Sequence, residues 1–184
     1  MDEHTVYLIL SDTGTLFTRC IKLFTKKPHN HASISFDSQL IEVYSFGRKK
    51  PNNPFIGGFV KEDIRDDFFK NACCAIYSIR VTKEQHDKMK EIIHQMEKEK
   101  HCYRYNLLGL FFIMFNIPFP RKNAYFCSQF VASVLHESGA LYWSKHPSLV
   151  TPYDLLDDYK MEHIYEGKLQ HYYLMHPVST LIVG

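Results

Sequence analysis

Two short segments decide the expected fold of this chain: residues 30–36, Asn-His-Ala-Ser-Ile-Ser-Phe, and residues 125–131, Tyr-Phe-Cys-Ser-Gln-Phe-Val. From His31 onward the first segment alternates polar and apolar side chains, which predicts a strand with an apolar core face. The second segment places Cys127 at the entrance of an apolar helix. A strand histidine and a cysteine at a helix N-terminus are the two components of a thiolate–imidazole pair. We therefore expect an α+β fold in which an antiparallel sheet packs against helices.

The other elements follow from hydrophobic periodicity and from capping and turn residues. Apolar runs and alternation predict strands at residues 6–10, 31–36, 40–46 and 73–81 and again within 161–183. Helical periodicity and capping residues predict helices at residues 12–26, 82–99 and 123–139 and a short helix from 151. In these interpretations Pro28 ends the first helix, Asn123 caps the third and Gly139 ends it. Residues 47–58, rich in Gly, Pro and Asn, are expected to form an exposed loop and a substrate-side flap.

Length and composition favour one globular domain spanning residues 1–184. The net charge of +2, with Lys and Arg spread along the chain, argues against nucleic-acid binding. Five cysteines, with Cys73 and Cys74 adjacent, match neither a disulfide framework nor a zinc knuckle, which favours reduced thiols in the cytoplasm. The sequence has no paired metal-ligand spacing, phosphate loop or dinucleotide fingerprint, so we expect no metal and no cofactor.

The apolar segments are too short for targeting or for membrane insertion. Residues 6–10 are shorter than the core of a signal peptide. Residues 107–115 form the strongest apolar run, well below the roughly 20 residues of a spanning helix. We expect no stable membrane insertion, and we expect residues 107–115 to be buried beneath the cysteine helix. The sequence carries no signal for an oligomeric state.

A third site residue is predicted from strand pairing. If residues 37–38 form a two-residue turn, Ser33 lies opposite Glu42 and His31 lies opposite Tyr44. His31 and Glu42 are then diagonal neighbours on one face, within reach of a long carboxylate side chain. A register slip of two residues keeps the face but changes the reach, so this pairing is a hypothesis.

The predicted chemistry is nucleophilic. Cys127 would attack a carbonyl carbon, and His31 would act first as a base and then as an acid. Glu42 would orient the imidazole ring and stabilise its positive charge. The helix N-terminus favours a thiolate, and the N–H of Cys127 is placed to help hold an oxyanion.

Each of these residues also has an ordinary structural interpretation. Cys127, between Phe126 and Phe130, has the surroundings of a buried structural thiol. His31 fits an ordinary hydrogen-bonded strand residue, and Glu42 fits the solvent side of a strand. Residue chemistry alone leaves both interpretations open.

The order of these segments resembles the circularly permuted NlpC-type branch of the papain-like cysteine hydrolases, and in particular its small bacterial members. In the unpermuted members the cysteine helix comes first, whereas here the histidine strand precedes it. The resemblance covers most of the chain and rests on the strand from Val6, Thr13-Gly14, residues 30–32, 42–48, 105–109, 126–128 and Thr151-Pro152. It implies a permuted papain-like fold and a catalytic triad of Cys127, His31 and Glu42.

The resemblance also implies roles around the oxyanion. Tyr105 lies upstream of Cys127, as a tyrosine near the oxyanion site does in related enzymes, although core packing explains it equally well. We assign Ser128 and Tyr44 to the same oxyanion or substrate-binding group. The chain departs from the family's Asp-Cys-Ser-Gly motif, because it has Phe-Cys-Ser-Gln at residues 126–129. This departure leaves the substrate class open.

Three functions are compatible with these observations. The first is a thiol-dependent amidase or peptidase that cleaves a peptide or isopeptide-like bond in a small substrate through an acyl-enzyme. The second is a lipid acyltransferase or deacylase similar to lecithin retinol acyltransferase, with residues 107–115 at a membrane surface. The third is a non-catalytic module that binds a partner through residues 47–58.

Overall fold

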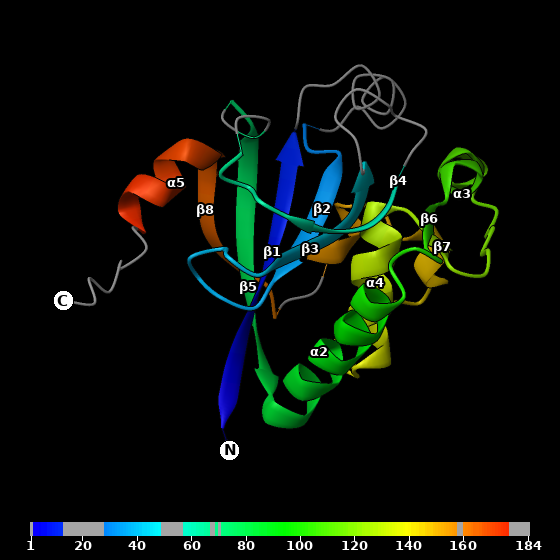
Figure 1. The fold of residues 1–184 in the computed structure, drawn as a ribbon, viewed down its shortest axis with the longest axis horizontal. Coiled ribbons are helices and arrows are strands. Elements are labelled where there is room, and N and C mark those ends of the chain that lie inside the picture. Colours follow the sequence, from blue (N-terminus) through cyan, green and yellow to red (C-terminus); the bar gives the residue numbers. More distant parts are fainter. Residues whose placement is uncertain are drawn as a thin grey trace.

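The computed structural model describes residues 2–12, 28–48, 57–66, 69, 71–157 and 160–176, the side chain of Arg48 excepted. A six-stranded sheet with the order β4-β3-β2-β1-β5-β8 organises this part of the chain (Figure 1). All its neighbouring strands are antiparallel. The strands are β1 (Glu3–Asp12), β2 (His31–Ser35), β3 (Val43–Arg48), β4 (Gly57–Glu62), β5 (Cys73–Thr82) and β8 (Glu162–Lys168).

One face of this sheet packs against two helices, α2 (Lys83–Lys98) and α4 (Cys127–Glu137) (Figure 1). Alternate strand residues point toward this layer because side chains alternate across a strand. Ile34 and Phe46 from the sheet, Met89 from α2 and Phe130 from α4 are fully buried in this core. Burial of such side chains is the main stabilising contribution of this layer.

The opposite face of the sheet carries a second, smaller core. Ile9 and Ile76 pack there with Leu169 and Tyr172 of α5 (Leu169–Met175). Ser33 is also buried, although the alternation in β2 predicts a core on the Ala32 and Ile34 side alone. The polar face of β2 is therefore covered as well, which matters for the site described below.

A two-stranded parallel sheet lies at the edge of the helical layer and holds α3 (Leu107–Phe112) away from it (Figure 1). Its strands are β6 (Arg104–Tyr105) and β7 (Ala124–Tyr125). The 3₁₀ turn η2 (Ile113–Phe115) follows α3, and β7 leads through Phe126 into α4. Two further 3₁₀ turns, η3 (Pro147–Leu149) and η4 (Asp154–Leu156), come before β8.

The α+β class with an antiparallel sheet packed against helices is confirmed. The predicted strands at residues 6–10 and 73–81 are the cores of β1 and β5. The predicted helix at 82–99 is α2, with its capping box: Thr82 Oγ1 accepts the N–H of Gln85, and the Gln85 side chain accepts the N–H of Thr82. The circular permutation of a papain-like fold stays a prediction.

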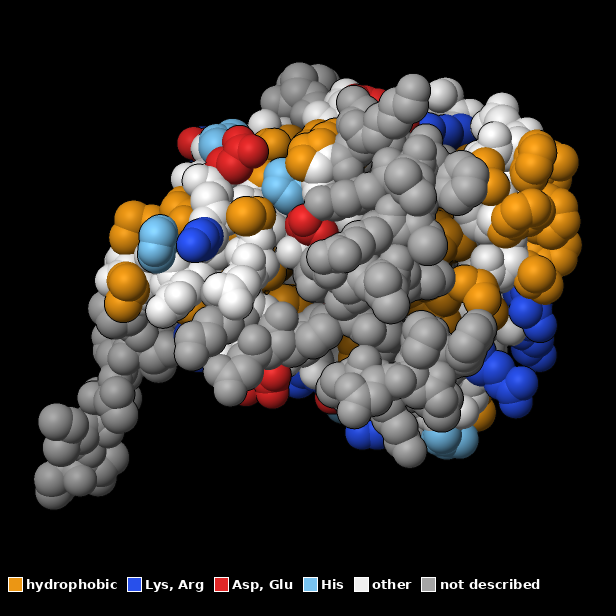
Figure 2. Space-filling view, turned by 90° about the horizontal axis from the view of Figure 1, so that it is seen from above, with side chains coloured by type: hydrophobic (Ala, Val, Ile, Leu, Met, Phe, Trp, Pro, Cys, Tyr) orange, Lys and Arg blue, Asp and Glu red, His pale blue; other side chains and the backbone are white. Residues whose placement is uncertain are grey.

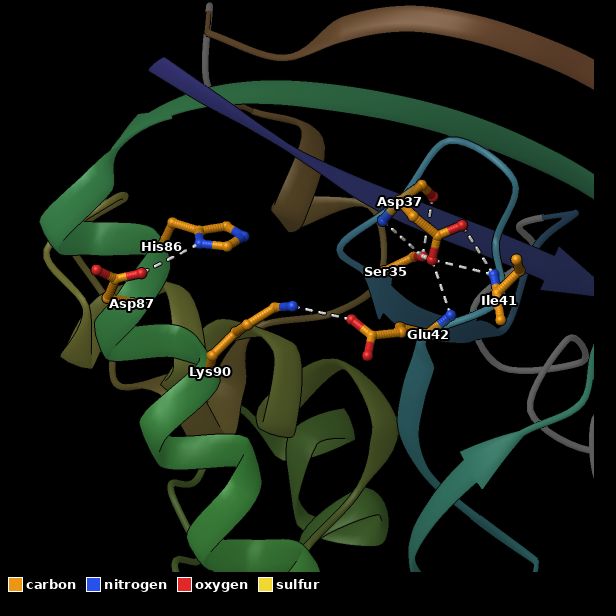
Figure 3. A network of polar contacts seen from close by, with 7 residues as sticks. All are labelled: Ser35, Asp37, Ile41, Glu42, His86, Asp87 and Lys90. Atoms are coloured by element: carbon orange, nitrogen blue, oxygen red, sulfur yellow. Dashed lines mark hydrogen bonds and ion pairs between the residues drawn. The ribbon is translucent and has the colours of Figure 1, made fainter. Parts of the chain in front are cut away.

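The hairpin of β2 and β3 exists, but its predicted register is wrong. Ile34 pairs with Tyr44 and Ser35 pairs with Val43, so residues 36–42 form the connection. The carboxylate of Asp37 accepts the backbone N–H groups of Ile41 (3.0 Å) and Glu42 (2.8 Å), which stabilises this longer turn (Figure 3). A short polar side chain that bonds to the backbone competes with a tight two-residue turn.

Several other predictions differ from the structure. The tail forms one strand and then α5, rather than strands throughout. The predicted helix from residue 151 is only the turn η4. The predicted loop at residues 47–58 is wrong at both ends, because residues 47–48 belong to β3 and residues 57–58 to β4. Asp12, the first residue of the predicted helix at 12–26, ends β1. The rest of that helix, residues 49–56 of the loop and residues 177–183 of the tail lie outside the described residues.

Candidate active site

Cys127 is the first residue of α4, and no side chain caps this helix. Asn123, the predicted cap, lies before β7 in a left-handed conformation (φ 53°), where its carbonyl accepts the N–H of Arg104. The residue at the cap position is Phe126, which has no polar side-chain atom. The first N–H groups of α4 are therefore available to the sulfur, and the N–H of Ser128 donates to it.

His31 connects Cys127 to a buried carboxylate. Its side chain hydrogen-bonds to the Cys127 sulfur, and its Nε2 lies 2.8 Å from Oε1 of Glu62. Because Nε2 is engaged by Glu62, Nδ1 is the ring nitrogen left for the sulfur. The order Cys127, His31, Glu62 is the arrangement of nucleophile, base and orienting acid.

Glu62 ends β4 and is held by two serines of the neighbouring strands. Ser33 of β2 donates its hydroxyl to Oε2 at 2.5 Å, and Ser45 of β3 donates to Oε1 at 2.7 Å. The side chain of Glu62 is only 8% exposed and that of His31 only 13%. A buried carboxylate needs such hydrogen bonds, because burial alone disfavours its charged form.

The electrostatics of the three groups favour charge separation. Burial lowers the pKa of His31, but the charge of Glu62 and the hydrogen bonds to Cys127 and Glu62 outweigh it and raise the pKa to about 10. Burial raises the pKa of Cys127, yet the hydrogen bond and charge of His31 and the N–H groups of Ala32 and Ser128 bring it below its ordinary value. Burial also raises the pKa of Glu62, and His31 with the two serine hydroxyls lowers it overall. The three shifts together favour the thiolate, the imidazolium and the carboxylate over the neutral forms.

Tyr105 adds a hydroxyl to the sulfur. It hydrogen-bonds to Cys127, and burial, followed by the thiolate charge, raises its pKa well above the ordinary value. The phenol therefore stays protonated beside the thiolate. Gly57 allows β4 to lie close to Tyr105, since a Cβ at Gly57 would lie 2.9 Å from Cβ of Tyr105. The structure thus brings Cys127, His31 and Tyr105 together.

Glu42 does not join them, and its predicted contact with His31 is wrong. It precedes β3, and its carboxylate accepts a hydrogen bond from Nζ of Lys90 on α2 at 2.9 Å (Figure 3). The physical reason is the register of the hairpin, which shifts by an odd number of residues and moves position 42 away from the histidine.

Two other predicted site residues have structural contacts. The hydroxyl of Ser128 donates to the carbonyl of Val150 at 2.8 Å, so only its backbone N–H faces the sulfur. Tyr44 lies opposite Ile34 rather than His31, and its ring stacks on Phe59 in the helical core. Neither side chain reaches the thiolate by a contact of the described structure.

Glu62 is the site residue that sequence reasoning missed. Residues 57–62, Gly-Gly-Phe-Val-Lys-Glu, form β4 without an alternation of polar and apolar side chains, and Glu62 ends this strand. Phe59 and Val60, an aromatic and a β-branched residue, are a weak local signal for this third strand and for its carboxylate. Choosing between Glu42 and Glu62 requires the register, which local sequence does not contain.

Comparisons of the chain with protein-family models, with curated proteins and with solved structures found no match. Within the described residues, no three His, Cys, Asp or Glu side chains are grouped so that they could hold a metal ion.

Proposed function

We propose that this protein is a thiol-dependent hydrolase that cleaves an amide bond of a peptide or isopeptide-like substrate through an acyl-enzyme. The observation that carries the proposal is the buried contact chain from Cys127 through His31 to Glu62. A structural thiol has no need of a neighbouring imidazolium, whereas a catalytic one does. The order of the histidine strand before the cysteine helix supports placement in the permuted NlpC-type branch.

The reaction has two halves. The thiolate of Cys127 attacks the carbonyl carbon and forms a C–S bond, with the negative charge passing to the carbonyl oxygen. When the C–N bond breaks, His31 gives its proton to the leaving amine. Water then attacks the thioester, His31 accepts a proton from it, and the carboxylic acid leaves as the C–S bond breaks. Glu62 stays ionised and stabilises the imidazolium.

The oxyanion requires donors close to the sulfur. The uncapped first turn of α4 offers backbone N–H groups, and the protonated hydroxyl of Tyr105 hydrogen-bonds to the Cys127 sulfur. Each good donor to an oxyanion is worth roughly a hundredfold or more in rate. Tyr105 therefore keeps its predicted role in the proposal, while the side chain of Ser128 does not.

A thiolate measurement tests the proposal. Each cysteine is alkylated with iodoacetamide between about pH 5 and 9 and followed by peptide mass spectrometry, with the exposed Cys73 and Cys102 as internal controls. Near pH 6 we expect Cys127 to react at least about tenfold faster than both controls, because ordinary thiols are protonated there. His31→Ala should abolish this advantage.

An acylation measurement completes the test. The protein is incubated with p-nitrophenyl acetate, and the acetyl adduct is located by peptide mass spectrometry. We expect a hydroxylamine-sensitive adduct on Cys127 that is absent from Cys127→Ala. A Cys127 that reacts no faster than Cys73 and acquires no acyl group would overturn the hydrolase and favour the non-catalytic binding module.

One observation favours the lipid alternative. Residues 107–115 are not buried beneath α4 as expected, and five of the apolar side chains between 107 and 115 are exposed: Leu107, Leu108, Phe111, Met114 and Phe115. A lipid acyl chain linked by an ester or amide is a substrate that such a surface would approach. A panel of acyl esters and amides of increasing chain length separates the two substrate classes, because a lipid enzyme gains rate with chain length.

A further inference from the structure

An exposed apolar feature of the described chain is the α3 surface, defined here as Leu108, Phe111, Met114, Phe115 and Ile117. The side chain of Phe115 is 59% exposed and that of Phe111 is 53% exposed. Their ring centroids lie 5.4 Å apart, so the two rings form one patch. Figure 2 shows hydrophobic side chains gathered at the edge of the molecule where α3 lies. Contiguous patches of this kind mark interaction surfaces.

The charged residues of the segment that carries the α3 surface have one sign. Residues 103–125 contain no Asp or Glu, but they contain Arg104, Arg121 and Lys122, all of which are exposed. The backbone holds these cations together at the base of α3, since Arg104 pairs with Ala124 across β6 and β7 and Arg121 forms a bridge to Ala124. Figure 2 shows Lys and Arg side chains directly beside the apolar edge.

The α3 surface is rigidly connected to the candidate site. Asn106 accepts the N–H of Gly109 at the start of α3 and donates to the carbonyl of Phe119, which closes the segment on itself. Phe112 stacks on Phe119 at 4.7 Å and supports the exposed rings from below. Tyr105, which hydrogen-bonds to Cys127, is the residue directly before Asn106.

We propose that the α3 surface docks peripherally on an anionic lipid bilayer and turns the Tyr105 side of the candidate site toward it. Apolar and aromatic side chains at the tip, with cations at the base, match the layers of a membrane interface, where acyl chains lie below anionic headgroups. A protein partner on this surface would offer carboxylates to the cations. A bilayer fits better, because it offers anionic headgroups to the cations and acyl chains to the exposed aromatic rings. Within the described residues, no helix combines the length and hydrophobicity needed to cross a bilayer, so the contact is a surface contact.

Vesicle co-sedimentation of the full chain tests the proposal. The probes are phosphatidylcholine vesicles and the same vesicles containing phosphatidylglycerol, each at low and high salt. We expect binding to the anionic vesicles that weakens with salt. Phe111→Ser combined with Phe115→Ser should lower the bound fraction at least about tenfold, and Arg121→Gln combined with Lys122→Gln should remove the preference for anionic vesicles.

Matched controls make the result specific. Leu174→Ser combined with Met175→Ser removes equally exposed apolar side chains from α5, and it should leave vesicle binding unchanged. Equal binding by the Phe111/Phe115 double variant, or no binding by the native chain, would overturn the proposal. Self-association that the Phe111/Phe115 double variant abolishes, without vesicle binding, would instead assign the surface to a second copy of the chain.

The proposal goes beyond the hydrolase and fails independently of it. Cys127→Ala should bind vesicles as the native protein does, because the α3 surface does not include the thiol. Conversely, the Phe111/Phe115 double variant should keep the alkylation profile of Cys127. A native protein that binds vesicles but has no reactive Cys127 would contradict only the hydrolase. A native protein with a reactive Cys127 that binds no vesicles would contradict only the docking on a bilayer.

Discussion

Glu62 is a charged residue that the fold buries, and its neighbours explain why it can stay charged. Removing a carboxylate and an imidazolium from water costs several kcal/mol for each ion unless close contacts replace the lost hydration. Ser33, Ser45 and His31 supply these contacts at 2.5, 2.7 and 2.8 Å. An arrangement with this many polar groups around one carboxylate is typical of a functional site rather than of a hydrophobic core.

The role of Glu62 can be separated from that of Glu42 by a matched pair of variants. Glu62→Gln removes the charge that raises the pKa of His31, so the imidazolium and the thiolate both lose stability. We expect the Cys127 alkylation profile to move to higher pH by about one unit or more, a loss of roughly tenfold in rate near pH 6.

Glu42→Gln is the control for this experiment, since it removes only an exposed ion pair with Lys90. Its alkylation profile should coincide with that of the native protein. If Glu42→Gln moved the profile and Glu62→Gln did not, the assignment of the third residue would be reversed.

At the residue scale, the sequence predicts Cys127, His31 and Tyr105 because each lies in a local pattern: a helix entrance, a strand start and a segment similar to the family's. The third residue could not be predicted in the same way. Its identity depends on the pairing of β2, β3 and β4, and the Asp37 side chain changes that pairing by stabilising a longer turn. A shift of an odd number of residues exchanges one face for the other.

At the scale of elements, the two long helices of the described chain begin in opposite ways. In α2 the side chains of Thr82 and Gln85 satisfy the first N–H groups, whereas Phe126, the residue before α4, supplies no side-chain cap. A capped N-terminus is optimised for stability, and an uncapped one keeps its partial positive charge for another group. In α4 the group that interacts with the partial positive charge is the Cys127 sulfur.

Thr82→Ala should therefore destabilise the protein. The variant removes the acceptor for the N–H of Gln85, and the expected loss in free energy of unfolding is about 1 kcal/mol. Urea unfolding followed by circular dichroism measures it. Lys88→Ala, on the exposed surface of the same helix, should change the free energy of unfolding by well under half of that, and an equal loss would contradict the capping argument.

Elements that carry complete local signals, such as β1, β5 and α2, were predictable from the sequence. The helix α3 was predictable as an apolar segment but not as an exposed one, since hydrophobicity alone says that a segment avoids water and does not say what covers it. The tail was mispredicted as strands because α5 is only seven residues long and contains two tyrosines, which favour strands, while its Leu169 and Tyr172 are buried in the second core.

At the scale of the whole molecule, the site couples stability to pH. The folded-state pKa of His31 is raised from 6.5 to about 10, so its contribution to stability is fully present below pH 6.5 and is lost as the pH rises through about 10. Cys127 and Glu62 have lowered pKa values, so their contributions are present above their unfolded values and are lost as the pH falls. The cysteine and histidine contributions thus oppose one another in alkaline solution.

Without the Cys127 thiol, the contribution of His31 to the pH dependence of stability can be measured. The free energy of unfolding of Cys127→Ala should decrease as the pH rises above about 6.5, because Glu62 still raises the pKa of His31, although by less than Glu62 and the thiolate together do. Adding Glu62→Gln to this variant should flatten that decrease. Urea titrations across this range measure both, and a decrease of the same size in the double variant would contradict the pairing.

The α+β class and the helix-on-sheet layering follow from periodicity, so they could be predicted for the whole chain. That the sheet is covered on both faces could not, because this requires α5 and the loop around Leu40, which are distant in the sequence, to pack on the same face. Long-range burial of this kind is a property of the assembled tertiary structure and leaves a weak local signal.

Strand β4 has a position in the sheet that bears on how the protein would lose its chemistry. It is one of the two edge strands of the six-stranded sheet and is hydrogen-bonded along one side to β3. Edge strands separate from a sheet at a lower free energy than global unfolding requires. Detachment of β4 would withdraw Glu62 from His31 while β1, β2 and β5 stay paired. Mild heating would therefore lower the reactivity of the Cys127 thiolate before the circular dichroism signal of the fold is lost.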